Sequence, residues 1–222
     1  MIADDVSLRR DIVEIARQAE AMGMVLHSQG NFSARIPGTD YVLVTASGVP
    51  YANMGPDDIV TVDLEGRKVH GIHEPTSERA IHTMTYRTYP WVGGCVHVES
   101  PYVNALYTLN LTVPNILGNF VYLFAGKGLA AAPSLRSGNP DFARITLEAM
   151  GDHFGVVWKN HGMFCVGQDI RLAFDRCVAA EQAARVYYLA LALKLGEPDL
   201  IPADVQAEMV AFAEEKGWGR AV

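Results

Sequence analysis

Apolar positions recur at two spacings along the chain, and these spacings predict helices interleaved with short strands. Between Val6 and Met22 the apolar residues recur every three or four positions, as on one face of an amphipathic helix. Runs rich in β-branched and aromatic residues follow, separated by turn sequences such as Pro37-Gly38 and Ser47-Gly48. The expected strands are 31–36, 41–45, 59–63, 92–98 and a pair across 156–166.

The same spacings predict five further helices. Pro75-Thr76-Ser77-Glu78 is typical of a helix start, with Thr76 or Ser77 capping the helix and Glu78 in its first turn. The expected helices are 76–89, 101–109, 141–150, 170–195 and 203–216. Residues 118–139 are rich in glycine and we assign no element to them. Because we find no repeat and no linker, we expect one layered α/β domain over residues 1–222.

Composition narrows the class of partner. Half of the 222 residues are hydrophobic, 19% are charged, and the formal net charge is −7, which is an ordinary balance for a globular protein. A negative chain without a basic stripe is a poor nucleic-acid binder. A small anionic substrate stays open, because local hydrogen-bond donors decide whether it binds.

The cysteines and the apolar segments bear on location. Cys95, Cys165 and Cys177 lie in apolar runs without CxxC spacing, so we expect buried, reduced thiols and a cytoplasmic protein. No basic segment followed by an apolar stretch opens the chain, and the apolar stretch 186–195 is too short to cross a bilayer. We therefore expect neither a signal peptide nor a membrane segment.

One strand carries unusual chemistry in the run Cys95-Val96-His97-Val98-Glu99-Ser100. Alternate residues of a strand share a face, so His97 and Glu99 are expected to point away from Val96 and Val98. Burying an imidazole and a carboxylate is costly unless something compensates them. A divalent metal would do so, because two histidines and one glutamate form a known catalytic zinc set. A hydrogen-bonded His–Glu pair explains this run alone equally well.

Three further segments add polar groups. Asn160-His161-Gly162 places a second histidine at a turn between two apolar strands, where its side chain can reach a cleft. Pro75-Thr76-Ser77-Glu78 places hydroxyls and a carboxylate at a helix N-terminus, which attracts anions. Gly30-Asn31 and Thr45-Ala46-Ser47-Gly48 form a third group. Taken singly, each of these segments would be an ordinary turn or helix cap.

Together and in this order, the segments resemble the class II aldolase family. They are Gly30-Asn31-Phe32-Ser33-Ala34-Arg35, Thr45-Ala46-Ser47-Gly48, Pro75-Thr76-Ser77-Glu78, His97-Val98-Glu99-Ser100-Pro101 and Asn160-His161-Gly162. The resemblance covers roughly residues 6–195. It implies a single three-layer α/β domain, with a central, mostly antiparallel sheet flanked by helices.

The resemblance also implies a site. One divalent metal per subunit would be bound by His97, Glu99 and His161, with zinc favoured and manganese or cobalt as alternatives. Glu78 would be the acid/base in the retro-aldol cleavage of a small sugar phosphate, through a metal-stabilised enediolate. The phosphate would be bound by Asn31, Ser47, Gly48, Thr76 and Ser77. A homotetramer is also implied.

The sequence departs from the family pattern at two places. Glu99 stands where the family usually has a second histidine, and its negative charge lowers the net positive charge of a bound metal and makes manganese more favourable. Where the family's aldolases draw a proton-donating tyrosine from a neighbouring subunit's tail, the best match is Trp218, which has no hydroxyl. Both departures leave the exact reaction open.

Several alternatives follow. A decarboxylase acting on a hydroxylated aromatic or β-oxo acid would use the same metal, and Arg136 would then meet the carboxylate or phosphate of the substrate. A pentulose-phosphate 4-epimerase is less favoured, because such enzymes usually carry Asp at the position of Glu78. A non-catalytic module like the adducin head would be expected to lack His97, Glu99 and His161.

The remaining histidines receive plainer interpretations. His82 lies four residues after Glu78 and can share its helical face, so we expect it to support the site or to pack rather than to bind metal. His70, His73 and His153 fall in expected loops or helix ends and are expected to be solvated.

Overall fold

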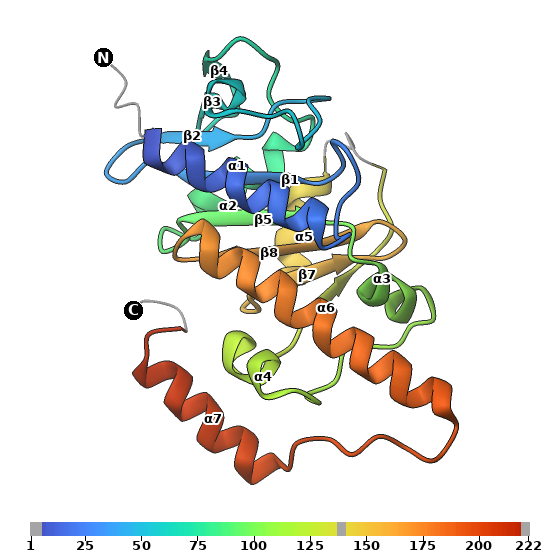
Figure 1. Ribbon diagram of the computed structural model, residues 1–222. Helices are drawn as coiled ribbons and strands as arrows, with labels where there is room; N and C mark the ends of the chain where they lie inside the picture. Colours follow the sequence, from blue (N-terminus) through green and yellow to red (C-terminus); the bar gives the residue numbers. More distant parts are fainter. Residues whose placement is uncertain (1–5, 137–140, 219–222) are drawn as a thin grey trace.

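The computed structural model describes residues 6–136 and 141–218, which form one sheet with helices on both faces (Figure 1). The strands are β1 (Asn31–Arg35), β2 (Tyr41–Val44), β3 (Val60–Asp63), β4 (Lys68–His70), β5 (Gly94–Val98), β6 (Ala130–Ala132), β7 (Gly155–Trp158) and β8 (Gly162–Gly167). Their order is β4-β3-β2-β1-β5-β8-β7-β6. Every neighbouring pair is antiparallel except β6 and β7, which are parallel.

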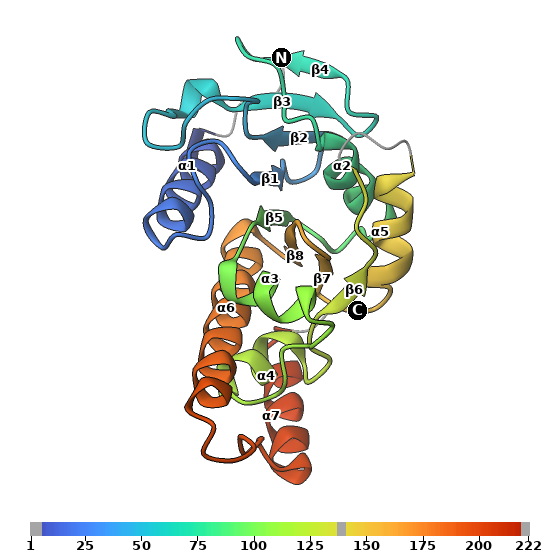
Figure 2. The same cartoon turned by 90° about the vertical axis from the view of Figure 1, so that its right-hand side faces the viewer.

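The helices complete a three-layer domain. They are α1 (Val6–Ala21), α2 (Arg79–Thr88), α3 (Pro101–Thr108), α4 (Gly118–Phe124), α5 (Phe142–Met150), α6 (Ile170–Leu193) and α7 (Ala203–Glu215), with a 3-10 turn η1 at Pro56–Asp58. Figure 2 shows α1 and α6 on one face of the sheet and α2 and α5 on the other. Helices α3 and α4 pack along α6, and α7 packs on α4.

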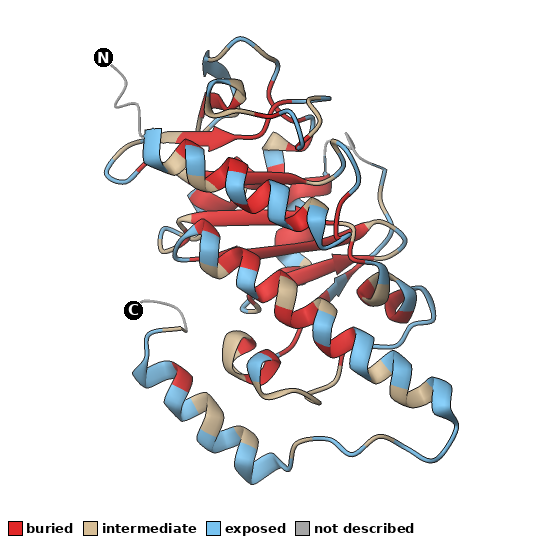
Figure 3. Cartoon of the chain, in the orientation of Figure 1, coloured by how far each residue is buried: buried red, intermediate tan, exposed pale blue. Residues whose placement is uncertain are grey.

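Each face of the sheet has its own hydrophobic core, coloured red along the strands in Figure 3. Val96 and Val98 of β5 belong to the core beneath α1 and α6. Cys95 belongs to the core beneath α2 and α5, together with Ile81 and Leu147 of those helices. The alternation expected for this strand is therefore observed, and it directs His97 towards α2 and α5.

The expected fold class is confirmed: a mostly antiparallel sheet lies between two helical layers. Three short elements were not expected, namely β4, α4 and β6. All three residues of β4 are exposed, so this edge strand lacks an apolar alternation, and α4 and β6 lie within the glycine-rich segment. The expected domain extent of 1–222 includes residues 1–5, 137–140 and 219–222, which lie outside the described ranges.

The expected start of α2 was wrong by one turn. The helix begins at Arg79 with Glu78 as N-cap residue, and neither Thr76 nor Ser77 caps it. Pro75 instead forms a β-bridge with Ala46, and the Thr76 N–H donates to the Thr45 carbonyl at 3.0 Å. This pairing holds the backbone extended up to Thr76, so a helix cannot begin there.

Smaller expectations have mixed outcomes. Cys95, Cys165 and Cys177 are buried free thiols, as expected. His70 is exposed, but it ends β4 rather than lying in a loop. His73 and His153 are partly solvated, with 35% and 33% of their side chains exposed, and each also has a partner: His73 is paired with Asp58 and His153 with the Met150 carbonyl. In the part of the chain that the structure describes, no helix is both long and apolar enough to span a bilayer.

We predict that Gly94→Ala destabilises the protein strongly, because a Cβ at Gly94 would lie 2.3 Å from the Ile170 backbone, where α6 begins against β5. The expected loss is about 2–4 kcal/mol in the free energy of unfolding, measured by denaturant titration. Gly55→Ala is the matched control, because its nearest atom would be 3.7 Å away, and we expect it to cost less than about 1 kcal/mol. Equal effects of the two substitutions would contradict the close approach.

Candidate metal centre

The candidate site lies on the α2/α5 face of the sheet, where β1 pairs with β5. Asn31 is opposite His97 and Ser33 is opposite Cys95 in this antiparallel register. Residues that face each other in such a pair project to the same side of the sheet. The β1 residues therefore project beside His97 into the layer between the sheet and α2.

Three side chains converge there. The Glu78 carboxylate lies 3.6 Å from Nε2 of His97 through one oxygen and 3.6 Å from Nε2 of His161 through the other. One ligand atom of each residue lies within 4.8 Å of those of the other two. Ligand atoms about 2.1 Å from a tetrahedral ion are roughly 3.4 Å apart. The spacing and the donor set thus fit one divalent cation.

His97 is held in the tautomer that a metal ligand needs. Its Nδ1 lies 3.0 Å from the Met163 carbonyl oxygen, and since a carbonyl only accepts, Nδ1 carries the proton and Nε2 offers its lone pair. Burial lowers the pKa of His97 to about 4, although the nearby Glu78 raises it. The ring is therefore neutral, and able to bind a metal, at neutral pH.

His161 reaches the site from the turn between β7 and β8, as expected. Asn160 adopts a left-handed conformation with φ 63°, and the His161 ring stacks on Trp158 with a centroid distance of 5.2 Å and an interplanar angle of 28°. Gly162 is required beside it, because a Cβ there would lie 2.5 Å from the Val98 carbonyl oxygen. The ring centroids of His97 and His161 are 4.9 Å apart.

Glu99 lies near the centre, but its carboxylate does not join the three-residue group. Strand β5 ends at Val98, and the Glu99 N–H donates to the Met24 carbonyl. Burial raises the pKa of Glu99, whereas the neighbouring His161 lowers it. Asn104 donates through Nδ2 to the carbonyl oxygens of both Glu99 and His161, at 2.7 and 3.1 Å. The two segments are thus tied together, and Glu99 remains a predicted ligand.

The residues predicted to bind phosphate are brought together around the start of α2. The Ala46–Pro75 bridge joins their two loops, and the Ser47 N–H donates to the Glu74 carbonyl. Ser47, Gly48 and Ser77 are exposed, whereas Thr76 is buried and its Oγ1 accepts from the Glu78 N–H at 3.3 Å. Asn31 is buried and donates through Nδ2 to Glu78 at 2.8 Å. Their roles towards phosphate remain predictions.

Two other predicted residues lie elsewhere. Arg136 is exposed, next to the undescribed residues 137–140. Trp218 packs against Tyr122 and Phe212 of its own chain, and its carbonyl accepts from Arg176. Gly219, which ends the motif around Trp218, lies outside the described residues. Neither placement tests the roles considered for Arg136 and Trp218.

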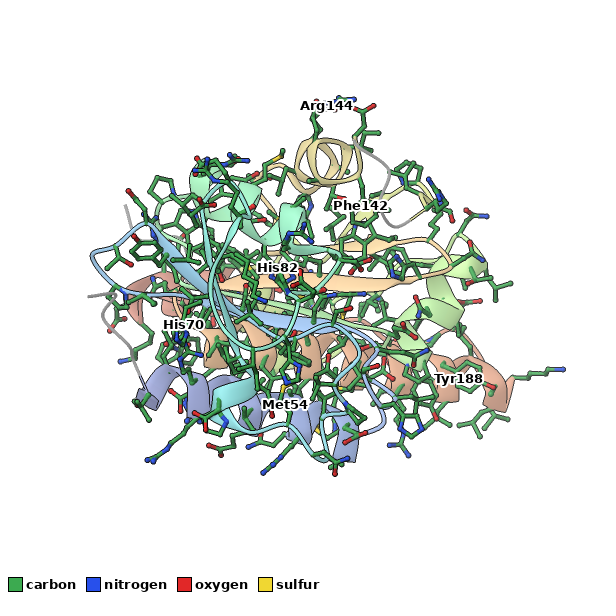
Figure 4. The ribbon with its side chains drawn as sticks, turned by 90° about the horizontal axis from the view of Figure 1, so that it is seen from above. Met54, His70, His82, Phe142, Arg144 and Tyr188 are labelled. Atoms are coloured by element: carbon green, nitrogen blue, oxygen red, sulfur yellow. The ribbon has the colours of Figure 1, made fainter. Side chains whose placement is uncertain are left out.

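Two side chains beside the centre, Ser33 and Tyr86, were given no role from the sequence. His82 lies in the middle of the molecule between α2 and the sheet, while Arg144 on α5 points outward (Figure 4). Its ring contacts Asn31 and Ser33, which agrees with the supporting or packing role expected for it. The only signal in the sequence is the four-residue spacing of Glu78, His82 and Tyr86, which places them on one helical face.

A sheet flanked by helices, with two imidazoles and a carboxylate converging beside β5, is the arrangement that the resemblance to metal-dependent lyases implies. The model of the Class II Aldolase and Adducin N-terminal domain matches residues 10–188. The chain belongs to this family. The expected family is thereby confirmed, and the curated aldolase relatives confirm the expected enzyme class, an aldolase-type lyase.

Curated relatives match along nearly the whole chain. It is 29% identical, over 96% of its own length and 97% of the relative's, to 5-deoxy-D-ribulose 1-phosphate aldolase of Bacillus thuringiensis serovar kurstaki. It is 30% identical to 5-methylthioribulose-1-phosphate/5-deoxyribulose-1-phosphate aldolase of Rhodospirillum rubrum, over 90% and 87% of the two chains.

Solved structures share the fold. An L-fuculose 1-phosphate aldolase superposes with a TM-score of 0.84 at 23% identity, over 94% of this chain and 96% of that one. YgbL of Klebsiella pneumoniae, described as a putative aldolase/epimerase/decarboxylase, superposes with a TM-score of 0.81 at 24% identity, over 91% and 97% of the chains.

We predict that the metal-free protein loses stability as the pH falls below about 6.5, the usual pKa of histidine. Burial lowers the pKa of His82 to about 3 and that of His97 to about 4, so the unfolded chain binds more protons in this range. His82→Gln should reduce the slope of unfolding free energy between pH 6 and 4 by about 1 kcal/mol per pH unit.

The measurement is denaturant unfolding in the presence of a chelator. Thr85→Val is the control, because Thr85 is buried on the same helix and its hydroxyl donates to the Ile81 carbonyl at 2.7 Å. It should lower stability without changing the slope. An unchanged slope in His82→Gln would mean that His82 is not held neutral by burial.

Proposed function

We propose that the protein is a metal-dependent aldolase that cleaves a small ketose 1-phosphate. The observation that carries the proposal is the convergence of Glu78 with His97 and His161 on the α2/α5 face. The named activities of the two curated relatives support the substrate class, because both act on 1-phosphates of five-carbon ketoses.

In this proposal His97 and His161 bind the metal through Nε2, with a carboxylate as the third ligand. A divalent ion bound there supplies Lewis acidity to a substrate carbonyl. Zinc is favoured by the two imidazoles, and the carboxylate admits manganese or cobalt. The resemblance assigns the third position to Glu99, whereas Glu78 is the carboxylate that meets both histidines in the structure.

Glu78 moves the proton. Retro-aldol cleavage of a ketose 1-phosphate removes the proton from the C4 hydroxyl, breaks the C3–C4 bond and leaves its electron pair on C3, beside the C2 carbonyl. Reprotonation of C3 then gives an aldehyde and dihydroxyacetone phosphate. The carboxylate is buried, at 8% exposure, and lies against the two histidines, so it can both accept and return a proton at this place.

The phosphate is proposed to bind at the two loops that meet before α2. Ser47, Ser77 and the Gly48 backbone are exposed there, and an N-terminal helix end favours an anion. A homotetramer is part of the same proposal, with Trp218 of one subunit near the site of another. Exposed apolar side chains on the C-terminal half of α6 are consistent with a subunit contact. They include Val186 and Tyr188, of which Tyr188 is labelled in Figure 4.

We predict that two isosteric substitutions separate the roles of the carboxylates. Glu78→Gln should keep the metal and lower kcat by roughly 10²–10⁴-fold, because the amide cannot accept the proton. Glu99→Gln should weaken metal binding at least about tenfold, because a charged ligand is lost. Metal content by elemental analysis and kcat on the same samples are the measurements.

Each outcome has one reading. Full turnover by metal-loaded Glu78→Gln would exclude Glu78 as the acid/base. Loss of metal from Glu78→Gln, with retention in Glu99→Gln, would make Glu78 the resident ligand and contradict the proposed division of roles.

We predict that 5-deoxyribulose 1-phosphate is cleaved to dihydroxyacetone phosphate and acetaldehyde, detected by a coupled reductase. The unphosphorylated sugar should show a kcat/KM at least about 100-fold lower, because the phosphate contacts are lost. Chelation should abolish turnover and a divalent metal should restore it. Carbon dioxide release from a hydroxylated aromatic acid, with no sugar phosphate cleaved, would instead establish the decarboxylase alternative.

A further inference from the structure

A chain of buried polar side chains runs from the interior to Glu78. Ser33 Oγ lies 2.7 Å from the Tyr86 hydroxyl and 2.6 Å from His82 Nδ1. His82 Nε2 bonds Asn31 Oδ1, and Asn31 Nδ2 donates to Glu78 Oε2 at 2.8 Å. Tyr86, Ser33 and His82 are at most 1% exposed, and Asn31 is 4% exposed. The five residues come from β1, from α2 and from its N-cap.

The residue spacings of one helix face and one strand face bring these five side chains together. Glu78, His82 and Tyr86 are spaced by four residues, which is about 6 Å along one face of a helix. Asn31 and Ser33 are spaced by two residues, which is about 6.7 Å along one face of a strand. Because the spacings nearly agree, the His82 ring fits between Asn31 and Ser33 and bonds both.

The donors and acceptors in the chain have one direction. Asn31 donates to Glu78 through Nδ2, so its Oδ1 must accept from His82 Nε2–H. Burial lowers the pKa of His82 to about 3, so the ring is neutral and its Nδ1 must accept. Ser33 is the donor to Nδ1, and its oxygen then accepts from the Tyr86 hydroxyl. Every member is satisfied in this direction.

This direction of hydrogen bonding fixes the orientation of the Asn31 amide. If the amide were rotated by half a turn, its carbonyl oxygen would face the Glu78 carboxylate, and two acceptors would repel each other. The His82 Nε2–H prevents that rotation. We propose that His82 is a positioning residue, which acts through Asn31 to hold the Glu78 carboxylate in the orientation that proton transfer requires.

This inference rests on the proposed acid/base role of Glu78, and three variants at two positions test it. His82→Leu removes the donor, and kcat should fall about 10–100-fold while KM changes less than about threefold. His82→Gln can place an amide N–H at a similar reach, and it should restore kcat to within about threefold of the parent protein. Thr85→Val, a buried change on the same helix, should leave kcat within about twofold.

The results separate this inference from the proposed function. Suppose that Glu78→Gln is impaired but folded, and that metal-loaded His82→Leu keeps its kcat. The positioning role is then wrong, and the aldolase proposal stands. If Glu78→Gln is fully active, the proposed function itself fails. A rise in KM with kcat unchanged in His82→Leu would place the effect on substrate binding and overturn the inference.

A milder variant covers the case in which His82→Leu does not fold. Ser33→Ala removes the hydroxyl that donates to Nδ1 of His82. The His82 ring can then carry its proton on either nitrogen. The expected result is a fall in kcat of about 3–10-fold with metal content unchanged. An unchanged kcat in Ser33→Ala together with an unrescued His82→Gln would overturn the proposal.

Discussion

Burial of ionisable groups between the sheet and α2 is the constraint on which the site depends. Glu78, His82 and His97 are each less than a tenth exposed, and a buried carboxylate or imidazole costs free energy unless it has partners. Directed hydrogen bonds offset this cost. Asn31 donates to the Glu78 carboxylate, and the Met163 carbonyl accepts from His97 Nδ1. The same bonds leave the free Nε2 of His97 and the Glu78 carboxylate directed at one place, beside His161.

The fold holds this arrangement in place through two backbone pairings. Antiparallel pairing of β1 with β5 sets Asn31 beside His97, and the bridge between Ala46 and Pro75 sets where α2 begins. A shift of one residue in either pairing would turn the polar side chains towards the α1/α6 core. The position of Glu78 is therefore a property of the sheet register as much as of its own helix.

The predictable part of the site was the part carried by ordered motifs. His97 and His161 come together because the end of β5 pairs with the beginning of β8, directly after the turn that carries His161. Glu99 shows the limit of this reasoning, since alternation along β5 cannot be extended past Val98, where the chain leaves the strand. Glu99 lies close enough to Glu78 and His161 for their charges to shift its pKa, and its backbone carbonyl accepts a hydrogen bond from Asn104.

The sequence by itself determined the two apolar periods, the order of helices and strands, and the chemistry of each motif, because these depend on neighbours within one turn or two strand residues. Only the tertiary structure decided which carboxylate meets the histidines, where α2 begins, and that His82 bonds Asn31. Those outcomes depend on contacts between residues far apart along the chain. Their geometry is set by sheet register and layer packing, which local patterns do not encode.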